Sequence, residues 1–204
     1  MEIVLASASP ARHRLLTDAG VVPVVVVSAV DEDAILRALG PATPVEQVLV
    51  LAQAKARDAA SRLTSTHDAV VIGCDSMLDV DGTAFGKPAS VEEAKQRWMR
   101  DMAGRSAVLR TGHWLIRTST GEEVGEVAST TVWHERLTEP EIDAYISTGE
   151  PLQVAGGFTL DGLGAPFVER IDGDPSNVVG LSLPLLRRLL GGLGIVWTDL
   201  WHTP

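Results

Sequence analysis

Asp75 is the residue whose type and position best suit chemistry. It lies in the segment Gly73-Cys74-Asp75-Ser76, at the end of an apolar run over 69–73. The run predicts a buried strand, and a carboxylate at the carboxyl end of a strand lies where α/β sheets usually open their crevices. There it could bind Mg²⁺ or accept a proton from an attacking water. Taken alone, such an aspartate is more often a turn residue, so the interpretation depends on its companions.

A second candidate is an anion site at Ser9-Pro10-Ala11-Arg12, where a predicted strand at 2–6 turns into a predicted helix at 10–19. Free backbone N–H groups and the helix dipole attract anions at such a point. The side chains of Ser9 and Arg12 can add further donors. An ordinary capped helix with an exposed arginine is the alternative, and this segment alone favours it.

Lysine is scarce in this chain, which contains three lysines against 14 arginines. Lys55 and Lys87 flank Asp75 in the sequence. In a chain that otherwise uses arginine, a lysine indicates a position that requires a compact cation on a flexible side chain. Lys87 follows Gly86 and precedes Pro88, but the glycine spacing of a P-loop is missing. We interpret both lysines as candidate cations for the Asp75 site.

Two more groups near these segments could take part. Glu32 belongs to the acidic turn Asp31-Glu32-Asp33, which is usually a solvated loop but could supply a second carboxylate for a metal ion. Cys74 directly precedes Asp75 on the predicted strand, so the two side chains point to opposite faces of the sheet. We therefore predict that Cys74 is a core thiol and not a nucleophile. The histidines show no ligand spacing and are assigned no site.

The elements that must position these residues alternate between strands and helices along one domain, 1–204. Capping boxes are predicted at Thr43–Glu46 and Ser90–Glu93, and 138–141 is expected to cap a third helix. Asp81-Gly82 predicts a tight hairpin turn. The order indicates an α/β protein with a mixed sheet. The remaining strands are expected at 21–27, 69–75, 77–80, 83–85, 106–118, 123–134 and 167–171, and the remaining helices at 44–63, 91–102, 139–148 and 183–190.

Charge and cysteine content limit the partners. The formal net charge is −10, divided into −2 for residues 1–110 and −8 for residues 111–204, so a polyanionic ligand is expected in the first half. An acidic surface argues against nucleic-acid binding and against docking on anionic membranes. A single cysteine excludes an intramolecular disulfide and fits a reducing compartment, and no apolar run is long enough to span a membrane. We expect a cytoplasmic protein.

Taken in order, these segments resemble the Maf family of nucleotide pyrophosphatases. The resemblance covers nearly the whole chain, and the ordered set is specific although no single motif is decisive. The matching segments are 5–12, 51–56, 71–76, 86–88, 104–106, 145–151, 155–157, 171–174 and 177–181.

The resemblance implies a central mixed, twisted β-sheet with flanking helices, in two lobes around a cleft, often as a homodimer. It implies hydrolysis of a nucleoside triphosphate to the monophosphate and pyrophosphate with a divalent cation, Mg²⁺ or Mn²⁺. Asp75 matches the family's catalytic aspartate, which accepts a proton from water, and Glu32, or alternatively Asp31, matches its acidic turn. The residues that match its phosphate-side positions are Ser9, Arg12, Lys55 and Lys87. Positive charges around a positioned water need no nucleophilic side chain, so we expect direct water attack without a covalent intermediate.

Three positions depart from the family's patterns and leave the preferred base open. They are Ala11, where arginine is common, Ser76 and Asp161. Together they match neither the branch that resembles dTTP/UTP hydrolases nor the branch that resembles 7-methyl-GTP hydrolases. Arg14 could bind the phosphate that an alanine at position 11 cannot. The alternative function is a nucleotide-binding regulator of cell division, since the family is associated with septum formation, and it predicts binding without turnover.

Overall fold

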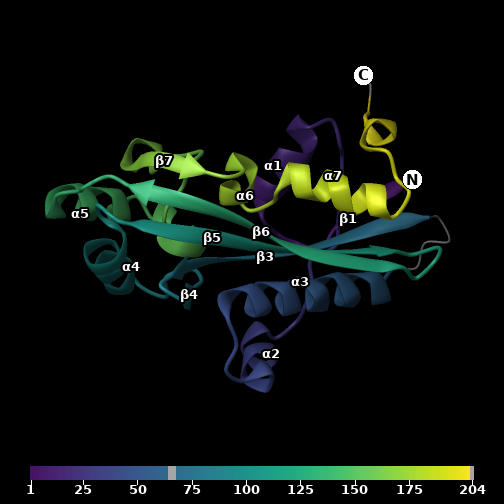
Figure 1. The fold of residues 1–204 in the computed structure, drawn as a ribbon, viewed down its shortest axis with the longest axis horizontal. Helices are drawn as coiled ribbons and strands as arrows, with labels where there is room; N and C mark the ends of the chain where they lie inside the picture. The colour runs from purple at the N-terminus through teal and green to yellow at the C-terminus, as the bar shows by residue number, and fades with distance from the viewer. Residues whose placement is uncertain (64–67, 203–204) are drawn as a thin grey trace.

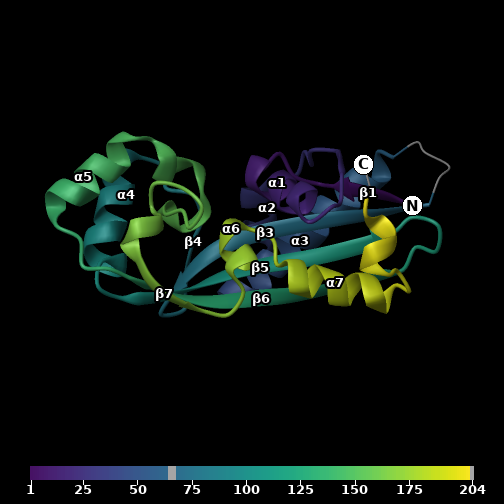
Figure 2. The same cartoon turned by 90° about the horizontal axis from the view of Figure 1, so that it is seen from above.

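The computed structural model describes residues 1–63 and 68–202, which form a mixed, seven-stranded twisted sheet with helices on both faces (Figures 1 and 2). The strand order is β2-β1-β3-β5-β6-β7, and β4 pairs with β3 beside this path. β1 runs parallel to β2 and β3, and all other pairs are antiparallel. The strands are β1 Glu2–Leu5, β2 Val24–Val25, β3 Ala69–Val80, β4 Thr83–Phe85, β5 Ser106–Arg117, β6 Glu123–His134 and β7 Val168–Asp172.

Helices gather at both ends of the long strands β3, β5 and β6. In Figure 2, α4 and α5 lie at one end of these strands, and α1, α2, α3 and α7 lie toward the other. The α-helices are α1 Pro10–Asp18, α2 Glu32–Leu39, α3 Pro44–Ser61, α4 Val91–Arg97, α5 Glu139–Ser147, α6 Pro175–Val179 and α7 Leu183–Gly192. Shorter turns are the π-turn η1 Trp98–Met102 and the 3₁₀ turns η2 Glu150–Gln153, η3 Ala155–Gly157, η4 Ala165–Phe167 and η5 Trp197–Leu200.

The two faces of β3 bury different helices, because successive side chains of a strand point to opposite sides. Val70, Ile72 and Cys74 pack into the cluster that contains α1 and α7, whereas Ala69 and Val71 pack against α3. Figure 1 shows α3 below the sheet and α1 and α7 above it. Both faces are covered, which explains why β3 is apolar over most of its length instead of alternating.

Cys74 is confirmed as a core thiol. Its side chain is fully buried and free of any disulfide. Burial raises the pKa of the Cys74 thiol to about 11, so the thiolate that a nucleophile requires is disfavoured.

Several local predictions were wrong, each for a physical reason. Of the strand expected at 21–27, only the two exposed residues of β2 pair with a neighbouring strand. Pro23 has no N–H and cannot donate a hydrogen bond between strands. The strands expected at 69–75 and 77–80 are one strand, β3, because it stays paired with β5 throughout. The acidic turn opens α2, whose first turn is stabilised by Asp31 accepting from the Ala34 N–H at 2.9 Å.

Three further differences concern helices. The helix expected at 91–102 is α4 followed by the π-turn η1, and the five-residue helix α6 was not expected. At the start of α4, Glu93 accepts from Ala89 N–H instead of closing a capping box on Ser90. The capping box at Thr43 is confirmed, and Thr138 caps α5 as expected, with its N–H donating to Glu141 Oε2 at 2.7 Å. Within the described residues, no helix is long and apolar enough to cross a membrane.

Candidate active site

Asp75 lies on the α3 face of β3, where Lys55 of α3 and Glu32 of α2 converge with it. Lys55 Nζ is 2.6 Å from Asp75 Oδ1 and 2.8 Å from Glu32 Oε1. Asp75 and Lys55 are buried, whereas half of the Glu32 side chain is exposed. The structure therefore brings together three of the residues singled out from the sequence. Lys55 Nζ has three N–H donors, so one remains for a ligand.

Two glycines explain why Lys55 reaches Asp75. A Cβ on Gly73 would lie 2.1 Å from the carbonyl oxygen of Ala52, and a Cβ on Gly112 would lie 2.2 Å from that of Val48. Gly112 is the cross-strand partner of Asp75, and Gly73 precedes Asp75 on the same face. Because both positions lack a side chain, the backbone of α3 rests directly on the sheet beside the carboxylate.

The Asp75 carboxyl titrates under two opposing influences. Burial raises the pKa of Asp75 above its ordinary value, and the neighbouring Lys55 ammonium opposes that rise. A carboxylate with a raised pKa is a stronger base than an exposed one, which suits a residue that accepts a proton from water.

Arg12 is held in place by four hydrogen bonds. Its Nε donates to the Gly180 carbonyl at 2.7 Å, Nη1 donates to Ser7 Oγ and to the Cys74 carbonyl at 3.0 Å each, and Nη2 donates to Ser76 Oγ at 3.0 Å. A guanidinium has five N–H donors, so one remains for a ligand. Arg12 thus ties α1 to β3 on both sides of Asp75.

Ser76 lies on the same face of the sheet as Arg12 and links it to a network of hydrogen bonds. Its hydroxyl is 2.9 Å from Thr111 Oγ1, and Thr111 in turn donates to the Asn177 carbonyl at 3.4 Å. Thr111 and Asn177 are fully buried. Sequence reasoning missed Ser7 and Thr111 as members of this site. Ser7 lies only two residues before Ser9, but no spacing rule connects Thr111 with Arg12.

Ser9 caps α1, as expected from Ser9-Pro10. Its hydroxyl accepts from the Arg12 N–H at 3.3 Å, which leaves its own proton free to donate. Ala11 follows in the first turn and is half-buried.

The structure does not bring Lys87 into contact with the Asp75 cluster. Lys87 is exposed in the segment after β4, and no ion pair of Lys87 occurs in the part of the chain that is described. Its backbone neighbours are held firmly: the Gly86 carbonyl accepts from Arg97 Nη1 at 2.7 Å and from the Gly156 N–H at 3.2 Å.

Asp161 forms an ion pair with Arg14 of α1, which joins the amino-terminal helix to the glycine-rich segment 155–166. The loop around Asp161 is anchored on Glu150, whose carboxylate accepts from the N–H groups of Leu163 and Gly164 at 3.2 and 3.3 Å. Arg14, which was expected to bind phosphate in place of an arginine at position 11, thus binds Asp161 in this structure.

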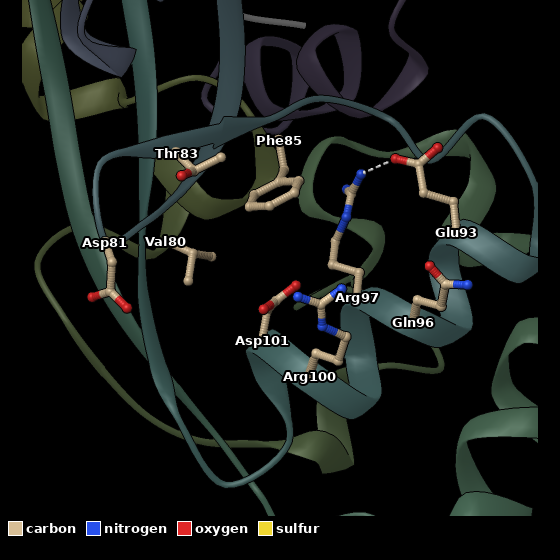
Figure 3. A pocket seen from close by; sticks show the side chains of 9 residues that line it. All are labelled: Val80, Asp81, Thr83, Phe85, Glu93, Gln96, Arg97, Arg100 and Asp101. Carbon is tan, nitrogen blue, oxygen red and sulfur yellow. Dashed lines mark hydrogen bonds and ion pairs between the residues drawn. The ribbon is translucent and has the colours of Figure 1, made fainter.

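Two surface hollows lie away from Asp75. One, of about 360 Å³, is lined by residues of β3, β4, α4 and η1, among them Phe85 and Arg97 (Figure 3). The other, of about 710 Å³, is lined by residues that include Arg105, Trp133 and Glu169. Neither is lined by a residue of the Asp75 cluster.

The donor set at Asp75 fits a divalent cation that is shared with a ligand. Among residues 1–63 and 68–202, no group of three or more His, Cys, Asp or Glu side chains is arranged to hold a metal ion. Asp75 and Glu32 nevertheless direct one carboxylate each at the same point, now taken by Lys55 Nζ. Mg²⁺ is commonly bound by one or two carboxylates with substrate phosphates and water completing the shell.

Comparison with known proteins gives one consistent result. A family model described as Maf-like protein matches residues 2–193. A nucleoside triphosphate pyrophosphatase of Streptomyces coelicolor is 54% identical over 98% of this chain and 94% of its own length. One of Nocardia farcinica is 55% identical over 99% and 97%, respectively. The solved structure of the Staphylococcus aureus Ham1 protein shares the fold, with a TM-score of 0.50, 16% identity and coverage of 95% of this chain and 100% of its own.

Proposed function

This chain belongs to the Maf-like protein family, and on that premise we propose that it is a nucleoside triphosphate pyrophosphatase that releases pyrophosphate and a nucleoside monophosphate. The observation that carries the proposal is the buried Asp75 carboxylate, bound to Lys55 and beside Glu32. The names of the relatives from Streptomyces coelicolor and Nocardia farcinica support the same activity.

In the proposed reaction Asp75 accepts a proton from a water molecule as the water oxygen bonds to the α-phosphorus. The bond from the α-phosphorus to the oxygen that bridges to the β-phosphate breaks, and pyrophosphate leaves with that oxygen. Lys55 and Arg12 each offer one remaining N–H donor to the phosphates, and the Ser9 hydroxyl offers its proton. A divalent cation held by the second carboxylate oxygens of Asp75 and Glu32, beside those that bind Lys55, would neutralise phosphate charge.

The nucleotide is proposed to lie between two lobes of a single domain. The Arg14–Asp161 ion pair supports this arrangement, since it connects α1 with the segment that follows η3. Ala11, Ser76 and Asp161 are proposed to select the base. The homodimer remains a prediction, and the single buried cysteine supports a cytoplasmic location.

The decisive variant is Asp75→Asn, which keeps the shape of the side chain but removes the base. We expect pyrophosphate release to fall by about 10²- to 10⁴-fold, the usual contribution of a general base. Asp79→Asn is the matched control, because Asp79 is buried on the same strand and is bound to Arg110 at 2.8 Å. Wild-type activity in Asp75→Asn would refute the assignment.

Substrate choice is tested on a panel of standard and modified nucleoside triphosphates, with Mg²⁺ and Mn²⁺ supplied separately. Pyrophosphate release is measured as phosphate after inorganic pyrophosphatase is added. Turnover of any member supports the proposal. Nucleotide binding by calorimetry, together with a blank panel under every metal, would instead support the regulator of cell division.

A further inference from the structure

The segment that carries Lys87 is held on both sides of the lysine. Before it, the Gly86 carbonyl accepts from Arg97 and from the Gly156 N–H. After it, Pro88 is buried against Gly157, and the Ala89 N–H donates to Glu93 Oε2 at 2.9 Å. Lys87 itself is exposed, so a fixed backbone supports a free side chain.

Arg97 is the centre of this support. Its side chain is only 3% exposed, although arginine is rarely buried. Nη1 donates to the Gly86 carbonyl at 2.7 Å, Nη2 donates to Glu93 Oε1 at 2.7 Å, and the guanidinium carbon lies 4.8 Å from the ring centroid of Phe85. Figure 3 shows the Arg97–Glu93 pair beside Phe85 at the edge of the hollow.

Glu93 serves both ends of the segment. One oxygen binds Arg97, which holds Gly86, and the other accepts from the Ala89 N–H. The two residues are four apart on α4, a spacing that places their side chains on one face of the helix. The Glu93 carboxylate also balances the positive charge of the Arg97 guanidinium. Arg97 can therefore lie beside the segment that carries Lys87 without repelling the lysine ammonium.

We propose that Arg97 is a positioning residue for Lys87, fixing the backbone from Gly86 to Ala89 so that the Lys87 ammonium reaches the phosphates of the nucleotide. The inference rests on the proposed function and on the phosphate-side role that the family resemblance implies for Lys87. A lysine side chain has four flexible bonds, and its affinity for a phosphate depends on where its backbone begins. Small displacements of a positioning contact are costly in catalysis.

The test is a double-mutant cycle with Lys87→Ala, Arg97→Met and the combined variant. Steady-state pyrophosphate release supplies kcat and KM, and calorimetry with inorganic pyrophosphate supplies a binding constant that does not depend on turnover. We expect Arg97→Met to raise KM and the pyrophosphate Kd about tenfold, the cost of one misplaced charged hydrogen bond, with little change in kcat. In the Lys87→Ala background, Arg97→Met should have no further effect on either constant.

Arg100→Met is the matched control, because Arg100 lines the same hollow from η1 and is exposed. It should leave both constants unchanged. Arg97→Lys keeps the charge in a smaller side chain and should recover part of the affinity, and it replaces Arg97→Met in the cycle if that variant fails to fold.

Two outcomes would overturn the inference. If Lys87→Ala weakens binding but Arg97→Met does not, or if the two effects add fully, Arg97 does not act through Lys87, and the proposed function stands. If Lys87→Ala binds nucleotide and pyrophosphate as the wild type does, the phosphate role of Lys87 fails together with this inference, whereas the role of Asp75 is judged by its own variant.

Discussion

At the scale of single residues, the candidate site depends on cations that are already engaged. Lys55 bridges Asp75 and Glu32, and Arg12 donates four of its five side-chain N–H groups to other groups of the protein. Each keeps one N–H for a ligand. Cations fixed in this way lose little side-chain entropy when phosphate binds, which favours binding and orientation of the substrate.

Lys55→Met should move the pH dependence of catalysis. Burial raises the pKa of Asp75 and Lys55 lowers it, so removal of the ammonium lets the pKa rise further. Asp75 must be ionised to accept a proton, and therefore the acidic limb of kcat/KM should shift to higher pH. Lys95→Met is the control, since Lys95 binds Glu139 and Asp143 and not Asp75. An unshifted limb in Lys55→Met would argue against Asp75 as the base.

Ser76→Ala should destabilise the fold as well as impair the site. It removes the acceptor of Arg12 Nη2 and the hydroxyl partner of Thr111, both in a largely buried network. We expect a loss of about 1–3 kcal/mol in the free energy of unfolding, measured by urea titration. Ser76→Thr, which keeps a hydroxyl, should lose less. Ser147→Ala, at an exposed position of α5, should be nearly neutral. Equal stability of Ser76→Ala and wild type would show that the network contributes nothing.

At the scale of elements, the contact of α3 with the sheet decides whether the site exists. The helix supplies Lys55, and the glycines at 73 and 112 let its backbone touch β3 and β5. An ordinary side chain at either position would push α3 away from the carboxylate that Lys55 must reach.

Gly73→Ala tests this contact. The added methyl group would overlap the Ala52 carbonyl, so we expect a loss of about 1–3 kcal/mol in the free energy of unfolding, the usual cost of overpacking. Pyrophosphate release should fall with it, because Lys55 is displaced. Gly191→Ala in α7 is the control, since nothing lies within 4 Å of its added methyl group. A fully active and equally stable Gly73→Ala would contradict the argument.

At the scale of the whole molecule, two buried histidines make stability depend on pH. His113 and His134 lie in different parts of the core, and burial lowers the pKa of each to about 4 from an ordinary 6.5. The unfolded chain takes up these protons below pH 6.5, whereas the folded chain resists them until about pH 4. Their stabilisation is therefore complete above pH 6.5 and is lost as the pH falls toward 4. Asp75, with its raised pKa, acts in the opposite direction.

His134→Asn isolates one of these contributions. His134 Nδ1 lies 3.3 Å from the Arg105 carbonyl, and the asparagine amide can replace that donor. The smaller side chain lowers stability at every pH, but the fall in the free energy of unfolding between pH 6.5 and 4 should be smaller than in wild type by up to about 3 kcal/mol. Urea titrations at both pH values measure it. Identical pH dependence in the two proteins would show that His134 is not held neutral by burial.

The sequence by itself determined the fold class and most of the elements, and it singled out Asp75 as the proposed base. Those features have local signals: a capping box at Thr43, a turn at Asp81-Gly82 with positive φ at both residues, and an apolar strand that leads to Asp75. The family resemblance added roles for residues that no local pattern could relate.

Only the tertiary structure decided which of these residues meet. Lys55 and Asp75 are brought together because two glycines let a helix lie on the sheet, and Arg12 is tied to acceptors from distant segments of the chain. The same packing left Lys87 exposed and buried Arg97 beneath its loop. Such contacts depend on close approach between distant segments, and sequence spacing contains no measure of that distance.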